Sequence, residues 1–141
     1  MLGFTFAYRL AGGAPTVQPL AFAAEETLTV GDIAVESSGA AKLGATAGSK
    51  FLGAVLGTKK PTSAFAEEFI EVITDSDAVY SVTDNNARKM GDTLDLTGAT
   101  GKQKLAASSN KEFVVVATKV SSTEPTLVRF NTGKHLYNTA Q

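Results

Sequence analysis

Histidine is the side chain of this 141-residue chain best suited to acid–base chemistry, and the chain has a single one, His135. A histidine that acts as a general base needs a third group to orient it and a rigid scaffold around it. His135 lies near the C-terminus between Lys134 and Leu136, in what reads as a polar tail. We therefore expect a surface or interface histidine, and the sequence predicts no catalytic residue and no enzyme.

Metal and cofactor sites are not indicated either. Asp75 and Asp77 are spaced like the first ligands of a calcium loop, but the later ligands do not follow. We interpret both as turn residues. The chain has no cysteine, which excludes thiolate sites and disulfides. No glycine-rich stretch matches GxGxxG or GxxxxGK[ST], so no phosphate-binding loop and no cofactor are expected.

Paired carboxylates occur only as neighbours, at Glu25–Glu26 and Glu67–Glu68. Adjacent residues point to opposite sides of a strand, so neither pair forms an acid–base dyad by itself. Pairing of carboxylates far apart in the sequence stays open.

The charge balance argues against two classes of partner. Thirteen basic residues face 14 acidic ones, a net charge of −1, which provides no field for nucleic acid or an anionic membrane. No stretch approaches the roughly 18 apolar residues of a membrane span. Residues 1–10 lack the basic start and apolar run of a signal peptide.

The elements that would position any site are short strands. Gly, Ala, Ser and Thr are abundant and β-branched runs alternate with turn residues, which favours an all-β fold. At most one short helix is expected, a turn over residues 64–69. The expected strands cover residues 27–30, 33–35, 51–56, 68–73, 79–82, 94–96, 113–117 and 126–130.

The first residues form an alternating pattern. Phe4, Phe6, Tyr8 and Leu10 recur at period two, which is typical of a strand with one apolar face. Residues 11–15 break the chain, and Pro19 then restricts the next segment to an edge strand or an extended arm. One interpretation makes residues 1–10 the first strand of the core. We favour the other, an extended docking arm over residues 1–26 that adds a strand to a partner and precedes a β-domain over residues 27–141. The candidate interface residues are Phe4, Phe6, Tyr8, Leu10 and Phe22.

A weak internal repeat runs through the β-domain. Residues 42–51 read KLGATAGSKF and residues 104–113 read KLAASSNKEF, and each segment follows a Gly-Asp turn, at Gly31–Asp32 and Gly91–Asp92. The match predicts two related β-units around one core. Chance similarity in a chain rich in Gly, Ala and Ser is the alternative.

From residue 27 onward the pattern resembles a known family. The two Gly-Asp turns stand in VGDI (30–33) and MGDT (90–93), with KFLGAVLGT (50–58) and VITDSDAVYSV (72–82) between them. FVVVATKV (113–120) and LVRFNTGKHLYNTAQ (127–141) complete it. This succession of turns and strands resembles the head decoration (capsid cement) proteins of tailed bacteriophages.

The resemblance implies a structural virion protein with a small β-barrel or β-tulip domain. Such proteins sit as homotrimers on the outer surface of the capsid, where they clamp neighbouring subunits of the major capsid protein. Made in the bacterial cytoplasm, the protein would end up in the virion. The alternatives are another phage structural module, such as a head-fibre base or tail domain, and a cellular enzyme or carbohydrate-binding β-domain. The chain has no Trp and three Tyr, which disfavours a sugar-stacking platform.

Overall fold

The computed structural model describes residues 3–21, 27–37, 39–44, 50–57, 69–107 and 110–137, and these residues form an all-β fold. The prediction of an all-β domain is confirmed, and no helix occurs within these ranges. The expected helical turn lies outside them except for Phe69, which begins a strand. The strands are β1 (Phe4–Arg9), β2 (Val17–Ala21), β3 (Ile33–Ser37), β4 (Ala40–Leu43), β5 (Phe51–Ala54), β6 (Phe69–Ile73), β7 (Ala78–Val82), β8 (Thr93–Thr97), β9 (Lys104–Ala107), β10 (Phe113–Val115) and β11 (Thr126–Phe130).

The largest sheet has six antiparallel strands in the order β1-β7-β11-β10-β8-β9. Its inner face carries a column of aromatic rings. The centroids of Phe113 and Phe130 lie 5.0 Å apart, and Phe4 stacks on Phe113 at 5.3 Å. Phe51, from another sheet, stacks on Phe130 at 5.4 Å. Aromatic rings bury more apolar area than any other side chains, so this column is the main core of the fold.

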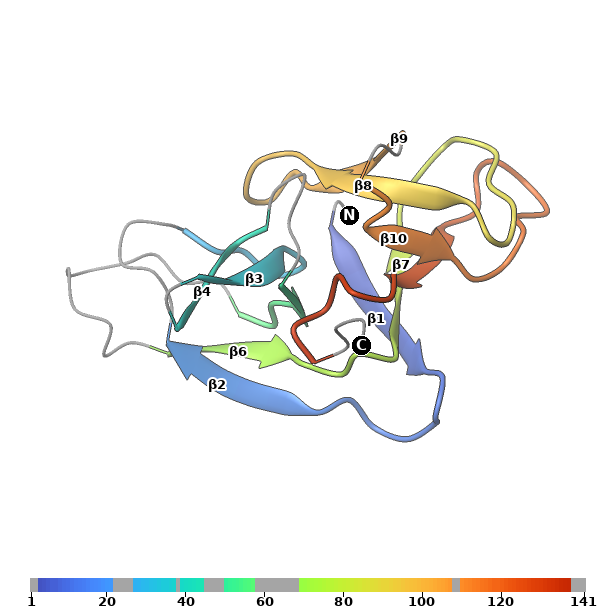
Figure 1. Ribbon diagram of the computed structural model, residues 1–141. Helices are drawn as coiled ribbons and strands as arrows, with labels where there is room; N and C mark the ends of the chain where they lie inside the picture. Colours follow the sequence, from blue (N-terminus) through green and yellow to red (C-terminus); the bar gives the residue numbers. More distant parts are fainter. Residues whose placement is uncertain are drawn as a thin grey trace.

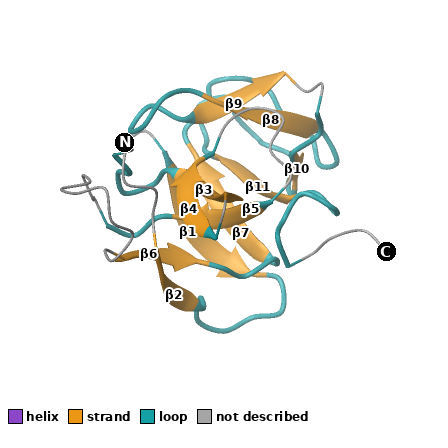
Figure 2. Cartoon of the chain, turned by 60° about the vertical axis from the view of Figure 1, so that its left-hand side comes forward, coloured by secondary structure: helices purple, strands orange, loops and turns teal. Residues whose placement is uncertain are grey.

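The other strands form a second layer, drawn in the lower and left part of Figure 1. Here β4-β3-β5 and the pair β2-β6 are separate sheets by strand pairing. A bridge between Val55 and Val72 and a 2.9 Å bond from Leu56 N–H to Glu71 O join β5 to β6. Figure 2 shows β2 and β6 side by side below β3, β4 and β5. A second core lies among these strands, made of Leu28, Ala34, Ala41, Leu52, Val55, Ile70 and Val72.

The expected barrel is not closed within the described ranges. The neighbouring strands β4, β3, β5, β6 and β2 curve round until β2 contacts β4, but no ladder of hydrogen bonds joins β2 to β4. The six-stranded sheet also keeps two edges, β1 and β9. A barrel needs strand pairing all the way round, so the fold is all-β without a closed barrel.

Gly53 is required where β5 meets its neighbours. A Cβ atom placed there would lie 1.9 Å from the carbonyl oxygen of Ile73 and 2.6 Å from the hydroxyl of Tyr80. The backbone also has a φ of 149°, which residues with a side chain rarely adopt. The Tyr80 hydroxyl accepts the Ala54 N–H at 3.2 Å, so this close approach ties β5 to β7.

The two Gly-Asp turns have the same geometry. Asp32 N–H donates to the carbonyl three residues earlier at 2.9 Å, and Asp92 N–H does so at 3.0 Å. The Asp32 carbonyl accepts Val55 N–H and the Asp92 carbonyl accepts Val115 N–H, both at 2.8 Å. Each turn leads into the central strand of a three-stranded set, β4-β3-β5 or β9-β8-β10.

This hydrogen bonding also gives the residue correspondence between the two sets. Val55 is equivalent to Val115, so the residue equivalent to Phe113 in the other strand set is Gly53 and not Phe51. The KL…F match in the sequence is therefore displaced by two residues in these last strands. Phe51 and Phe113 meet instead across the core, with ring centroids 6.1 Å apart.

The N-terminal segment is part of the sheets. Phe4 is 2% exposed, its N–H donates to Gly31 O at 2.8 Å, and β1 pairs with β7 from Phe4–Val82 onward. β2 pairs with β6 over its whole length, with Pro19 on this outer strand as expected for proline. The prediction of an extended docking arm is therefore wrong for residues 4–9 and 17–21. Phe4 lies in the core, and both segments pair with other strands of the same chain.

Candidate docking surface

The alternating residues of the N-terminus do not share one exposed face. Phe4 is buried, and Phe6 packs partly buried against the same core. The pairing of β1 with β7 then shifts, because Phe6 faces Tyr80 and Tyr8 faces Val79, which leaves Ala7 as an extra residue. A bulge of this kind re-aims the side chains that follow it. Beyond it Tyr8 is 44% exposed and Leu10 55% exposed.

The fifth predicted interface residue, Phe22, lies outside the described residues. The structure therefore exposes Tyr8 and Leu10, leaves Phe6 partly buried against the core, and places Phe4 inside the core. The bulge could not be read from the alternation of residue types, since Ala7 fits an unbroken strand equally well.

The end of β1 is held by two aspartates of the turn between β6 and β7. Arg9 Nε donates to Asp77 Oδ1 at 3.0 Å and lies 3.4 Å from Asp75 Oδ1. The N–H groups of Leu10 and Ala11 donate to the carbonyl and the Oδ2 of Asp77, at 3.1 and 2.9 Å. Asp75 and Asp77 are thus the turn residues that the sequence predicts. The exposed Tyr8 and Leu10 consequently stand on a fixed backbone.

The charge of Asp77 is stabilised by these contacts. Burial acts to raise the pKa of its carboxyl group. The hydrogen bonds from Ala11 and Arg9 act in the opposite direction and leave the pKa below its usual value. The same pair raises the pKa of Arg9 through its hydrogen bond to Asp77. The pair is therefore fully charged at neutral pH.

An apolar hollow adjoins the outer edge of β1. It has a volume of about 200 Å³, and Val30 and Leu56 at its rim are 46% and 43% exposed. Phe4 N–H points away from β7, so the Phe6 N–H, two residues on, faces the same outer side. Within the described ranges, β1 is the last strand of its sheet on this side. We call this edge and hollow the β1 surface; it is lined by Phe4, Thr5, Phe6, Val30, Gly31, Ala54, Val55 and Leu56.

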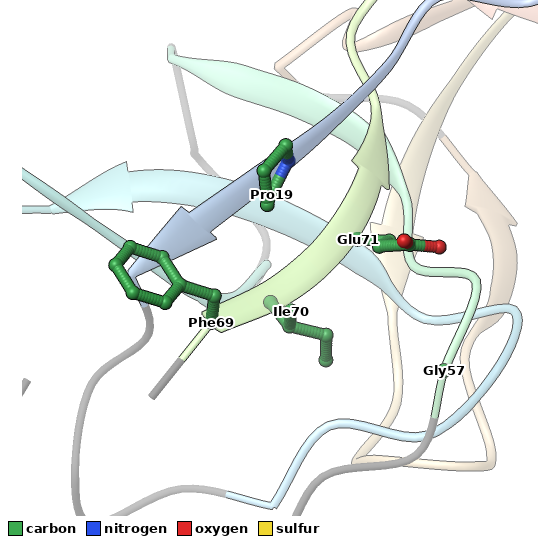
Figure 3. Close-up of a pocket in the computed structure, with 5 residues that line it drawn as sticks. All are labelled: Pro19, Gly57, Phe69, Ile70 and Glu71. Carbon is green, nitrogen blue, oxygen red and sulfur yellow. The ribbon is translucent and has the colours of Figure 1, made fainter. Parts of the chain in front are cut away.

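A second hollow, of about 350 Å³, lies beside β2 and β6 (Figure 3). Phe69 and Ile70 are neighbours on β6 and turn their side chains to different sides in this view. Phe69 is 55% exposed, whereas Ile70 is buried in the second core. Pro19, Gly57 and Glu71 complete the lining.

Two carboxylate residues from separate segments, Asp95 on β8 and Glu112 beside β10, are neighbours in space, because the Glu112 N–H lies 3.4 Å from Asp95 Oδ1. Both residues are buried. Asp95 accepts hydrogen bonds from Asn110 at 3.0 to 3.2 Å, and Glu112 Oε1 accepts the Leu96 N–H at 2.8 Å. These bonds use the carboxylates to satisfy backbone N–H groups on β8 and in the segment before β10, which is a structural role.

His135 differs from its prediction. It is 0% exposed, its Nε2 lies 2.7 Å from Leu52 O, and its Nδ1 accepts the Tyr137 N–H at 3.0 Å. The interpretation as a surface histidine in a polar tail is wrong, because the chain folds back onto β5 at this point. Nothing in the local sequence signals a contact with a residue 83 positions away.

Comparisons with known proteins add no assignment. No protein-family model matches the chain, and no curated protein matches it. In the described ranges no three His, Cys, Asp or Glu residues are grouped so that they could hold a metal ion. Those ranges also contain no helix long and apolar enough to cross a membrane.

Proposed function

We propose that this protein is a structural virion protein that binds the outer surface of a bacteriophage capsid and clamps neighbouring major capsid protein subunits. The pattern of turns and strands from residue 27 onward, which resembles capsid cement proteins, supports this class. The β1 surface supports a docking role, and it is the observation on which the proposal rests.

Strand addition is the mode of binding that the β1 surface favours. An extended segment of a partner can pair with the outer edge of β1 from Phe6 onward, because Gly31 O already accepts the Phe4 N–H. Main-chain hydrogen bonds would give affinity there, and adjoining pockets would give selectivity. The hollow next to Phe6 can take an apolar side chain of that segment. Tyr8 and Leu10 then supply exposed aromatic and aliphatic contacts at its end.

Rigidity and copy number make such a modest contact effective. The Arg9–Asp77 pair fixes the backbone before binding, which lowers the entropic cost of docking. A capsid offers many identical sites, and a homotrimer engages three of them at once, so weak contacts add up to stable attachment. Nearly zero net charge leaves little repulsion between copies packed on one shell.

The test is binding to expanded capsids of the encoding phage. The wild-type chain should co-sediment with them and raise their melting temperature. The double variant Tyr8→Ala, Leu10→Ala should bind at least tenfold more weakly. Val120→Ala is the matched control, because Val120 is 93% exposed and lies in the loop between β10 and β11, which contributes no residue to the lining of the β1 surface. Capsids that bind no wild-type protein would refute the proposal, and binding to tails alone would favour another phage structural module.

A further inference from the structure

The segment over residues 132–137 closes one edge of β5. Phe51 N–H donates to Lys134 O at 2.9 Å, and Leu136 N–H donates to Phe51 O at 2.9 Å. These two bonds form a parallel bridge between Phe51 and His135. The segment therefore behaves as a short added strand, and His135 is the residue that points inward from it.

The contacts of His135 require one neutral form of its ring. The carbonyl of Leu52 can only accept, so Nε2 carries the proton that donates to it at 2.7 Å. The Tyr137 N–H can only donate, so Nδ1 must offer its lone pair at 3.0 Å. Both nitrogens are satisfied when the ring is neutral. A proton added to Nδ1 would face the Tyr137 N–H and break that bond.

The surroundings of the ring disfavour its charged form. The ring is 0% exposed, and its centroid lies 5.3 Å from that of Phe130 and 5.7 Å from that of Tyr137. Burial lowers the pKa of His135 below its usual value, although the bond to Leu52 O and the charge of Asp75 both act to raise it. The other ionisable groups along the packed elements are Lys134 on the segment itself, Lys50 before β5 and Arg129 on β11.

We propose that His135 is an acid-sensitive latch: protonation of Nδ1 removes the acceptor of Tyr137 N–H and releases residues 134–137 from β5. Release removes Leu136 and Tyr137 from the lining of a hollow of about 130 Å³, whose other lining residues include Leu20, Ala41 and Leu52 at the second core. The segment is then free to leave while the aromatic core stays in place. This inference does not depend on capsid docking.

The direction of the pH effect follows from the two states. An unfolded or released histidine has a pKa of about 6.5. In the latched state the pKa is lower, so the released state binds more protons as the solution is acidified. The stability of the latch is therefore complete above about pH 6.5, and it is lost as the pH falls below that value toward the pKa of the latched ring.

The experiment uses NMR on the full chain between pH 7.5 and 4. Since His135 is the only histidine, its ring protons report protonation without overlap. The exchange protection of the Leu136 and Tyr137 amides should fall at least tenfold in step with ring protonation. The Val115 amide, bonded to Asp92 O at 2.8 Å, is the internal control and should keep its protection. A ring that stays neutral to pH 4, or one that titrates with both amides still protected, would overturn the latch.

Two variants separate the latch from general acid unfolding. His135→Gln should show lower exchange protection of both amides at pH 7.5, but no further stepwise loss of protection as the pH is lowered. A step of wild-type size in His135→Gln would contradict the proposal, because another group would then cause it. If His135→Gln does not fold, Asp75→Asn tests the same point. Loss of the Asp75 charge should move both ring titration and amide release to lower pH, and release that moves without the ring would refute the proposal.

Discussion

Arg9 and Asp77 are joined by a 3.0 Å hydrogen bond that ties the end of the first strand to the turn between β6 and β7. The two residues are 68 positions apart in the chain. Their side chains are 28% and 25% exposed, so solvent screens the pair and it adds little to overall stability. Its effect is local, because it orders the backbone that carries Tyr8 and Leu10.

Replacing Asp77 should therefore separate docking from folding. Asp77→Asn keeps the size of the side chain but removes the charge that binds Arg9, so the residues after β1 should become more mobile. We expect capsid binding to weaken by several-fold while the thermal midpoint changes by only a few degrees. Co-sedimentation and circular dichroism measure the two effects. A variant that binds as tightly as the wild type would show that this clamp does not support docking.

Gly53→Ala should be strongly destabilising. The new Cβ would overlap the Ile73 carbonyl and approach the Tyr80 hydroxyl, which accepts the Ala54 N–H of β5. Backbone strain and displaced strands together predict a loss of about 3 kcal/mol or more in the free energy of unfolding. Urea denaturation measures it. Gly57→Ala is the matched control, because no atom of the described residues lies within 4 Å of its Cβ position, and a similar loss there would contradict the steric explanation.

The Asp84 carboxylate should contribute stability that depends on pH. Burial acts to raise its pKa, but hydrogen bonds from Arg88 at 2.7 Å, Asn86 at 2.9 Å and Thr126 at 2.9 Å lower the pKa to about 2. The unfolded value is about 3.9, so the stabilisation is present above pH 4 and lost as the pH falls through 2. Asp84→Asn should cost about 1 to 3 kcal/mol at pH 7.

The difference between wild type and Asp84→Asn should shrink toward zero near pH 2. Asp92→Asn serves for comparison, since Asp92 is exposed and bonds one backbone N–H. Unfolding curves at pH 7, 4 and 2 are sufficient. An equal difference at all three pH values would mean that the charge of Asp84 plays no part.

The proposed placement on the capsid also predicts the state of the protein. In light scattering the free chain should behave as a trimer of its 14.6 kDa subunit, or as a monomer that becomes a trimer on the capsid. A stable dimer in both the free and the bound state would be incompatible with clamping around a three-fold axis.

The sequence is informative wherever the signal is local. Runs of β-branched and aromatic residues predicted β10 and β11, and the Gly-Asp turns stand where two central strands begin. The alternation of residues 4–10 predicted a strand, but its place at a sheet edge depends on pairing with β7, far along the chain. The bulge at Ala7, which decides what β1 exposes, has no signal in the residue types.

His135 shows why the rest could not be predicted. A lone histidine near a chain end is usually solvated. Here His135 is buried because it pairs with Phe51 and forms a hydrogen bond with Leu52 O. The requirement for glycine at position 53 has the same origin, since it arises from the approach of Ile73 and Tyr80. Both features depend on contacts between distant segments, which residue patterns do not encode.

The central claim is that the β1 surface docks on the capsid, and hydrogen exchange measured with and without expanded capsids tests it most directly. We predict that peptides covering residues 4–10, including the outward-facing Phe6 amide, become protected at least tenfold on binding, while peptides from β9 are unchanged. Binding that leaves residues 4–10 unprotected, or a chain that does not bind capsids at all, would contradict the account.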